Sequence, residues 1–307
     1  IAGKYWHSYT NESQDSYTTQ PHSGLWVYQN APLTQTKPNT IKNSTSLQDK
    51  LEAIASQHNI NPSYIAHTES LYAFYADKTD KYAHNILGDT KDSTKLIIVY
   101  EGQSYEYILE THLVYEDILP RLIDVDGDGR AEIVTITTDT SKGAGIHIYK
   151  WQNEKITLYS TLASIGTAYR WLNIAVIDDL DRDGVVEIAW VQTPHIGGVL
   201  KIAKIKQGAL QVLDEDFYYS NHAIGETNLC LSVATREDNK TLFYLPNQGR
   251  DKIVGFSFSK GALTKEREIN KKVDFAIPLH EQYEWGDLIL QPNCLLAHNV
   301  TLGTKEK

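Results

Sequence analysis

Residues 122–134, from Leu122 to Val134, read LIDVDGDGRAEIV. Three aspartates, Asp124, Asp126 and Asp128, fall within five positions of this stretch, and apolar residues flank them on both sides. Carboxylates held this close repel one another unless a positive charge lies among them. The stretch therefore predicts a cation site in an acidic turn between two strand-like segments.

A second stretch, Val176 to Val191, reads VIDDLDRDGVVEIAWV and repeats this pattern. Five positions match in residue type at one offset of 55 residues: Asp124 with Asp179, Asp126 with Asp181, Asp128 with Asp183, Gly129 with Gly184, and Glu132 with Glu187. Five matches at a single offset, with matching apolar flanks, indicate an internal repeat.

The sequence that follows each acidic loop predicts four short strands divided by turn residues. Apolar and polar residues alternate in these segments, and β-branched and aromatic residues are frequent. Four-stranded units that repeat every 40 to 50 residues or so are typical of a β-propeller. We therefore predict an all-β chain, with residues 1–307 forming a single propeller domain of five or six four-stranded blades. Pairing between N- and C-terminal strands is expected to close the ring.

Weaker copies of the unit flank the two clear ones. Residues 228–245 align one period later, but Thr235, Glu237 and Asn239 replace the aspartates, which predicts a loop that has lost its metal. Residues 70–110 predict a further unit with a degenerate turn at Asp77 to Lys81. Residues 44–59 instead have helical spacing, with Ser46 as the N-cap and Asp49 at the third helical position. This segment is expected to be a helical insertion or decoration.

The spacing of the acidic loops favours Ca²⁺, which takes six to eight oxygen ligands. Glycine at position 6 allows a positive φ, the carbonyl of Arg130 or Val185 at position 7 offers another oxygen, and Glu132 or Glu187 at position 9 completes the set. An EF-hand is excluded, because it requires a glutamate at position 12, where this chain has Thr135 and Trp190, and flanking helices.

The pattern DxDxDGxxE between two strands, at a period near 55, resembles the FG-GAP/VCBS repeat family of integrin-α-like calcium-binding β-propellers. In that family the calcium loop joins the innermost strand of a blade to the next strand. The resemblance extends over roughly residues 65–300, although no clear FG or GAP signature is present and only two loops keep full acidity. It implies ligand roles for two sets of residues: Asp124, Asp126, Asp128, Arg130 and Glu132, and Asp179, Asp181, Asp183, Val185 and Glu187.

We expect two structural calcium ions that clamp these turns; solvated acidic turns without metal and a catalytic ion are the alternatives. We assign no catalytic or other cofactor-binding residues, because the chain has no HExxH, GxSxG, P-loop or Rossmann motif. His147 and His195 are most simply a strand residue and a loop residue.

Composition restricts the partners and the compartment. The chain has 29 basic and 39 acidic residues, a formal charge of −10, which disfavours nucleic acid and anionic membranes. No apolar run approaches the roughly 18 residues of a transmembrane helix. The chain starts at Ile1 and has no methionine, which we interpret as the start of a processed or trimmed chain, and we expect an extracytoplasmic protein (periplasmic, cell-surface or secreted). Whether Cys230 and Cys294 form a disulfide stays open.

The leading functional hypothesis is a non-enzymatic module that binds a protein or a glycan through propeller loops. The chain has 19 Tyr and 6 Trp, and such side chains on loops can stack on sugars or anchor a protein partner. One alternative is a calcium-dependent carbohydrate-active enzyme such as a polysaccharide lyase, which needs a Lys, Tyr or His base beside an open metal. Another is a structural subunit of a cell-surface assembly, which predicts a large apolar face.

Overall fold

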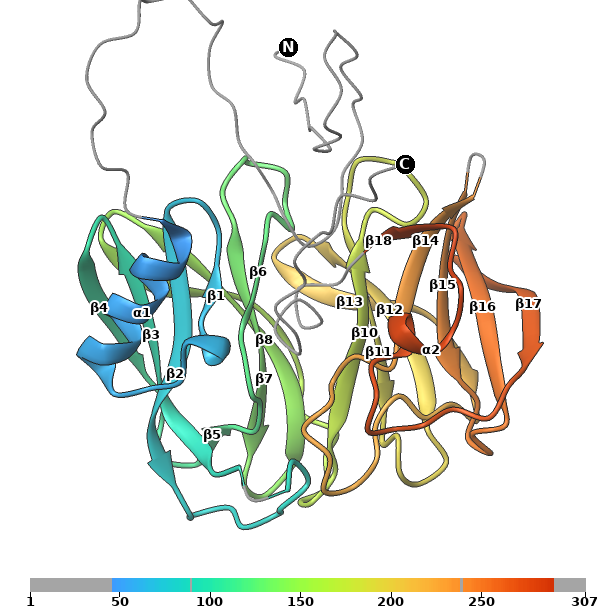
Figure 1. The fold of residues 1–307 in the computed structure, drawn as a ribbon, viewed down its shortest axis with the longest axis horizontal. Coiled ribbons are helices and arrows are strands. Elements are labelled where there is room, and N and C mark those ends of the chain that lie inside the picture. Colours follow the sequence, from blue (N-terminus) through green and yellow to red (C-terminus); the bar gives the residue numbers. More distant parts are fainter. Residues whose placement is uncertain (1–45, 89, 238–239, 290–307) are drawn as a thin grey trace, which may run out of the picture.

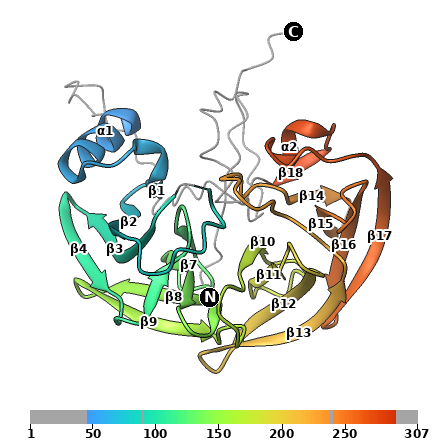
Figure 2. The ribbon, with the colours of Figure 1, turned by 90° about the horizontal axis from the view of Figure 1, so that it is seen from below.

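The computed structural model describes residues 46–88, 90–237 and 240–289. These residues form three antiparallel sheets, of nine, four and five strands. Figure 1 shows the strands standing side by side, and Figure 2 shows that groups of consecutive strands follow one another in chain order around an arc. The all-β prediction is confirmed, and the arrangement is propeller-like. The blade number and the closure of the ring stay predictions, since residues 1–45 and 290–307 lie outside the described residues.

Within the described residues, most strands belong to four consecutive antiparallel meanders, named the first to the fourth in chain order. The first contains β1 (Ala66–His67), β2 (Leu71–Thr79), β3 (Asp92–Tyr100) and β4 (Gln103–Ile108). The second contains β6 (Arg121–Ile123), β7 (Glu132–Asp139), β8 (Gly143–Gln152) and β9 (Lys155–Leu162). The third contains β10 (Leu172–Asp178), β11 (Glu187–Gln192), β12 (Val199–Lys206) and β13 (Ala209–Phe217). The fourth contains β14 (Val233–Glu237), β15 (Lys240–Pro246), β16 (Lys252–Ser259) and β17 (Ala262–Asn270).

Two further strands extend this pattern. β5 (Leu113–Tyr115) pairs with β7 along its length and with β3 at Ser93, so it joins the first two meanders into the nine-stranded sheet. β18 (Asp287–Ile289) pairs with β14 and adds a fifth strand to the fourth meander.

Neighbouring meanders pack face to face through layers of buried apolar side chains. The layer between the first and second includes Ile98, Tyr115, Ile133 and Tyr149. The next includes Ile136, Ile148, Trp171 and Trp190, and the last includes Val191, Ile202, Phe243 and Phe256. Burying a side chain of this size contributes about 2 kcal/mol, so these layers fix how the sheets face one another.

A helix is present where helical spacing predicts one. α1 (Leu47–His58) begins with a capping box, in which the Ser46 side chain accepts from the Asp49 amide at 3.1 Å and the Asp49 carboxylate accepts from the Ser46 amide at 3.0 Å. It ends at Asn59 in the left-handed conformation. Ile54 and Ala55 pack on the first meander, beside β2 and β3 (Figure 2). The 3₁₀ turn Pro62–Tyr64 and the short helix α2 (Leu279–Gln282) were not expected.

The prediction of a degenerate turn at Asp77 to Lys81 is wrong. β2 continues through Thr79, because Lys78 and Thr79 still pair with Ser93 and Asp92 of β3. The first-to-second strand connection of this meander is instead residues 68–70.

In the fourth meander, the loop expected at Thr235, Glu237 and Asn239 is wrong at its first two positions, because Thr235 and Glu237 lie in β14 and pair with β15. Asn239 lies outside the described residues. Cys230 is buried, and Cys294 also lies outside, so the disulfide question stays open.

Candidate functional site

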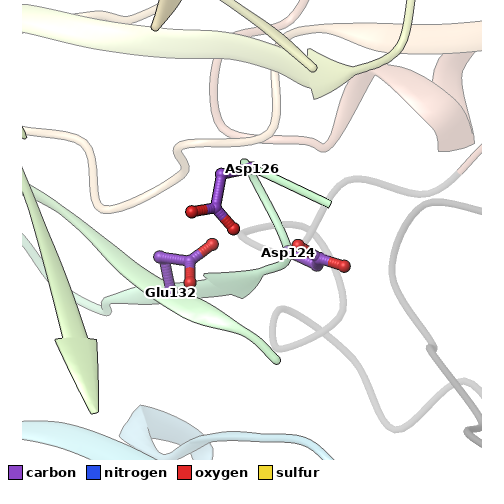
Figure 3. A group of neighbouring side chains, drawn as sticks. All are labelled: Asp124, Asp126 and Glu132. Carbon is purple, nitrogen blue, oxygen red and sulfur yellow. The ribbon is translucent and has the colours of Figure 1, made fainter. Parts of the chain in front are cut away.

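The two acidic loops occupy the same place in consecutive meanders. Residues 124–131 connect β6 to β7, and residues 179–186 connect β10 to β11. Each loop therefore joins the first strand of its meander to the second, as the repeat predicts. Figure 3 shows Asp124, Asp126 and Glu132 side by side at the first loop.

The backbone of both loops is folded by the aspartates themselves. In the first loop, the Asp124 carboxylate accepts from the amide of Gly129 at 2.9 Å, and the Asp128 carboxylate accepts from the amide of Arg130 at 2.9 Å. The second loop has the same bonds at the same lengths, from Gly184 to Asp179 and from Val185 to Asp183. These side-chain-to-backbone bonds explain why aspartate recurs at this spacing in a turn.

The glycine at position 6 has the conformation that the sequence predicts. φ is 89° at Gly129 and 87° at Gly184, in the left-handed region that residues with a Cβ rarely adopt. Position 4 is also left-handed, with φ of 77° at Gly127 and 61° at Arg182. The two loops thus share a backbone course as well as a hydrogen-bond pattern.

The glutamate at position 9 closes each loop. Glu132 Oε2 accepts from the backbone amide of Val125 at 2.8 Å, and Glu187 Oε2 accepts from that of Leu180 at 2.7 Å. Both glutamates are buried, at 2% and 0% exposure. One oxygen of each carboxylate is thus committed to the backbone, and Oε1 remains available to a cation.

The structure brings together three of the four predicted acidic ligands in each loop. Oxygens of Asp124, Asp126 and Glu132 lie within 4.8 Å of one another, and so do oxygens of the matching set Asp179, Asp181 and Glu187. Two ligands of one calcium, each 2.3–2.6 Å from the ion, lie at most about 5 Å apart, so this spacing fits.

The remaining predicted ligands are not part of these groups. Asp128 and Asp183 bond the backbone through one oxygen, and the other faces a lysine. Ligand roles for Asp128, Asp183 and the carbonyls of Arg130 and Val185 stay predictions.

Two buried oxygens in the second loop support a cation-binding role. Asp179 Oδ1 accepts no hydrogen bond from any described residue, and Glu187 Oε1 lies 2.6 Å from the ammonium of Lys204. A buried carboxylate oxygen without a donor is costly unless a positive charge faces it. The chemistry and spacing of both loops therefore fit a hard cation such as Ca²⁺.

Each loop also faces a lysine that the sequence analysis missed. Lys150 Nζ, on β8, forms an ion pair with Asp126 and lies 3.3 Å from Asp128 Oδ2 and 3.8 Å from Glu132 Oε1. Lys204 Nζ, on β12, lies 3.2 Å from Asp181, 2.7 Å from Asp183 and 2.6 Å from Glu187.

The internal repeat could have indicated these lysines. Lys150 and Lys204 follow the same pattern, in IYK and IAK, at an offset of 54 residues. Lys204 is the cross-strand partner of Glu187, and Lys150 follows Tyr149, the partner of Ile133. In each meander the lysine on the third strand is therefore placed opposite the position-9 glutamate on the second strand.

The electrostatics of the first loop reflect this arrangement. Burial raises the pKa of Glu132 to about 8, and the charges of Asp126 and Asp124 act in the same direction. Although burial opposes it, the hydrogen bond to Asp126 and the charge of Glu132 raise the pKa of Lys150 above its ordinary value. The buried carboxyl group at position 9 is therefore ionised at neutral pH only if a cation lies close to it.

A groove of about 720 Å³ lies beside the first loop. The first meander contributes the β1–β2 connection and the β3–β4 hairpin, and the second contributes the acidic loop and the β8–β9 hairpin. Trp151 lines the groove with Tyr105 and Tyr100, at ring-centroid distances of 4.4 Å and 6.0 Å. Gln103, Gln152 and Asn153 add amide groups to the lining.

Comparison with known proteins supports the repeat. Residues 124–190 match the family model described as an FG-GAP-like repeat, and this segment contains both acidic loops. The resemblance inferred from the aspartate spacing is therefore confirmed for this part of the chain. Among curated proteins, none matches the sequence significantly.

Solved structures give only distant similarity. A rhamnogalacturonan lyase of Bacillus licheniformis is 17% identical over 57% of this chain and 42% of its own, with a TM-score of 0.35. The periplasmic gluconolactonase of Pseudomonas aeruginosa is 14% identical over 67% and 54%, with a TM-score of 0.34. A Lactobacillus plantarum protein is 15% identical over 66% and 57%, with a TM-score of 0.39. This chain thus spans less than two thirds of each, and these likenesses carry no functional argument. Within the described residues, no helix is long and apolar enough to cross a membrane.

Proposed function

We propose that this protein is a calcium-stabilised β-propeller that binds an uncharged oligosaccharide, without transforming it, in the groove between the first and second meanders. The observation that carries the proposal is the lining of that groove, where three aromatic rings lie among amide and carboxylate side chains. A concave site of several hundred cubic ångströms with a few polar groups is typical of a small-ligand site.

The aromatic side chains suit a sugar. The faces of Trp151 and Tyr105 can pack on the apolar C–H face of a pyranose, while hydroxyl groups of the sugar bond to amides such as Gln103 and Asn153. Because Trp151 and Asn153 belong to one hairpin, β8–β9, they can act on the same sugar unit.

The charge of the groove favours a neutral glycan over an acidic one. Apart from Asp124, which belongs to the proposed calcium site, three acidic side chains line it, Glu69, Glu101 and Glu154, against one basic side chain, Arg130. A polymer of uronic acids would meet repulsion from most of this surface, so the groove is a poor site for such a substrate.

The lining also favours binding over lyase chemistry. A lyase needs a base, and neither Lys nor His occurs among the described residues that line the groove. The tyrosines of the lining are Tyr100 and Tyr105, and for Tyr105 desolvation and the charges of Glu154 and Glu101 raise the pKa, which makes its phenolate scarce at neutral pH.

Calcium would act on this groove through the first loop. Asp124, Gly129 and Arg130 of that loop form part of the wall, so an ion among Asp124, Asp126 and Glu132 would fix the wall in place. We propose the same structural role for a second ion among Asp179, Asp181 and Glu187. We also propose that the protein works outside the cytoplasm, where calcium sites as weak as about 10⁻⁴–10⁻³ M are used in extracellular modules.

The test is titration of the protein with a panel of neutral oligosaccharides, followed by calorimetry and tryptophan fluorescence. For any sugar that binds, Trp151→Ala should weaken binding about tenfold or more, because stacking on an aromatic ring is lost. Tyr283→Ala, which truncates an exposed aromatic residue outside the groove, should leave the affinity unchanged. If no neutral sugar binds, or if Trp151→Ala binds as well as the native chain, the proposal is wrong.

A further inference from the structure

Each acidic loop already has a cation of the protein beside its carboxylates. In both loops a lysine ammonium lies against the same oxygens that a metal would use, Asp126 and Glu132 in the first and Asp181 and Glu187 in the second. An ammonium group and a calcium ion cannot occupy the same space between these carboxylates.

We propose that Lys150 and Lys204 are resident cations of the two loops, which set calcium affinity by competing for the shared oxygens, so that the first loop fills before the second. This inference rests on the calcium binding proposed above. It assigns to each loop a residue, outside the repeat motif, that determines whether divalent metal enters.

The repetition shows that these contacts are a built feature. A flexible surface lysine can reach an acidic group by chance, but here two lysines at one structural position reach two loops at one structural position. Their side chains are only 15% and 8% exposed, respectively, so each lysine is largely buried beside its loop. A lysine gives up much of its hydration there only in return for close contact with carboxylates.

The two lysines differ in how tightly they are held. Lys204 Nζ lies within 3.2 Å of three carboxylates, including Glu187, which is fully buried. Lys150 is in close contact with Asp126 alone, with Asp128 at 3.3 Å and Glu132 at 3.8 Å. Calcium must therefore displace a better-coordinated ammonium from the second loop than from the first.

Among the described residues, Lys150 contacts an aromatic ring and Lys204 does not. Lys150 Nζ lies 4.3 Å from the centre of the Tyr159 ring while it contacts the carboxylates, so this cation–π contact helps to hold the ammonium in the first loop. Tyr159 occupies the register shift between β8 and β9, where Ile148–Ser160 is followed by Tyr149–Leu158. The matching shift between β12 and β13 contains Leu213, which has no such ring.

The test is a calcium titration by calorimetry of four chains: the native protein, Lys150→Met, Lys204→Met and Lys201→Met. Methionine keeps much of the length of lysine and removes the charge. Lys201 is the matched control, because it lies on β12 and pairs with Glu215 at 3.3 Å, away from the acidic loop. We expect the native protein to bind calcium in two steps. Lys204→Met should raise the calcium affinity of the second step tenfold or more, and Lys150→Met should raise that of the first step by a similar factor. Lys201→Met should leave both affinities unchanged.

A fifth chain, Tyr159→Leu, copies the residue of the third meander into the second. It should strengthen the first calcium step by a few fold while leaving the second unchanged, because Lys150 loses a contact that holds its ammonium in the loop. Melting temperatures with calcium and with chelator accompany each titration. Chelation should lower the melting temperature of Lys204→Met more than that of the native chain, because its second loop then depends on metal alone.

The outcomes separate the two proposals. Equal calcium affinities in the native, Lys150→Met and Lys204→Met chains would overturn the competition and leave the calcium sites standing. No calcium binding by any folded chain would overturn both the competition and the calcium sites. Sugar binding is measured independently, so its failure would leave the lysine assignment unaffected.

Discussion

Glu132 Oε2 accepts a hydrogen bond from the backbone amide of Val125 at 2.8 Å, across the whole first loop. This bond makes position 9 a loop-closing residue as well as a potential metal ligand, since the amide of Val125 is buried beneath it. The same relationship holds between Glu187 and Leu180. The glutamate therefore contributes to stability even when no metal is bound.

We predict that Glu132→Ala lowers the free energy of unfolding by about 2–3 kcal/mol, because it leaves a buried amide unpaired and removes an ion-pair partner of Lys150. Glu132→Gln should lose less, since an amide oxygen can still accept from Val125. Chemical denaturation in the presence of chelator measures both, with Glu110→Ala as an exposed control. An equal loss for alanine and glutamine would show that the hydrogen bond to Val125 does not matter.

Asp126→Ala should lower the melting temperature in calcium by several degrees and remove the part of the calcium-dependent gain that comes from the first loop. The carboxylate belongs to the metal-binding group and is also the closest partner of Lys150. Because the ion pair is lost as well, part of the loss should persist in chelator. A melting temperature equal to that of the native chain in both buffers would count against a cation site here.

Gly184→Ala should lower the free energy of unfolding by about 1 kcal/mol, because φ is 87° and a residue with a Cβ disfavours that conformation. Nothing lies within 4 Å of the added Cβ, so any loss comes from the backbone and not from a clash. Gly184→Asn should lose less, as asparagine tolerates positive φ better. Gly286→Ala, at a glycine without positive φ and with equally open surroundings, is the matched control, and thermal denaturation of the three variants gives the comparison.

Acid should weaken the fold through the contact between His195 and His222. His222 Nε2 donates to the Glu226 carbonyl at 2.8 Å, which leaves Nδ1 to accept from His195 Nε2 at 3.0 Å, so both rings are held neutral. Burial lowers the pKa of His222 from 6.5 to about 4, and burial with the nearby His222 lowers that of His195 to about 3.

A lowered folded-state pKa means that the unfolded chain takes up the proton first as the pH falls. Stability is therefore fully present above about pH 6.5 and decreases below it, by up to about 1.4 kcal/mol per pH unit for each histidine. His222→Gln should flatten the decline between pH 7 and pH 5, whereas the exposed His112→Gln should not. Urea denaturation across this range measures the free energy of unfolding at each pH. Parallel pH dependences for the native chain, His222→Gln and His112→Gln would contradict the role given to His222.

The local parts of the site could be predicted from the sequence because local interactions create them. Asp124 and Asp128 fold their own turn through bonds to amides two to five residues away, and Gly129 is needed at a fixed place in it. The helix α1 was predictable for the same reason, since Ser46 and Asp49 cap it across three residues.

The rest depends on strand register, which short-range patterns do not specify. Lys150 reaches Asp126 from 24 positions away, because two strands of the meander separate them. The turn expected at Asp77 was wrong because pairing with β3 extends β2 through residues that resemble a turn in isolation. The aromatic groove combines hairpins of two meanders. Tyr105 and Trp151 are far apart in the sequence, so no sequence pattern indicated that they lie together.

The bridging strand β5 has a consequence for how the molecule comes apart. Repeat proteins can open one unit at a time when each unit contacts its neighbours only through side chains. Here Tyr115 pairs through the backbone with both Ser93 of the first meander and Thr137 of the second. Local opening of either meander must break β5 pairing, so their slowest-exchanging amides should be released in a single cooperative event, separate from those of the third and fourth.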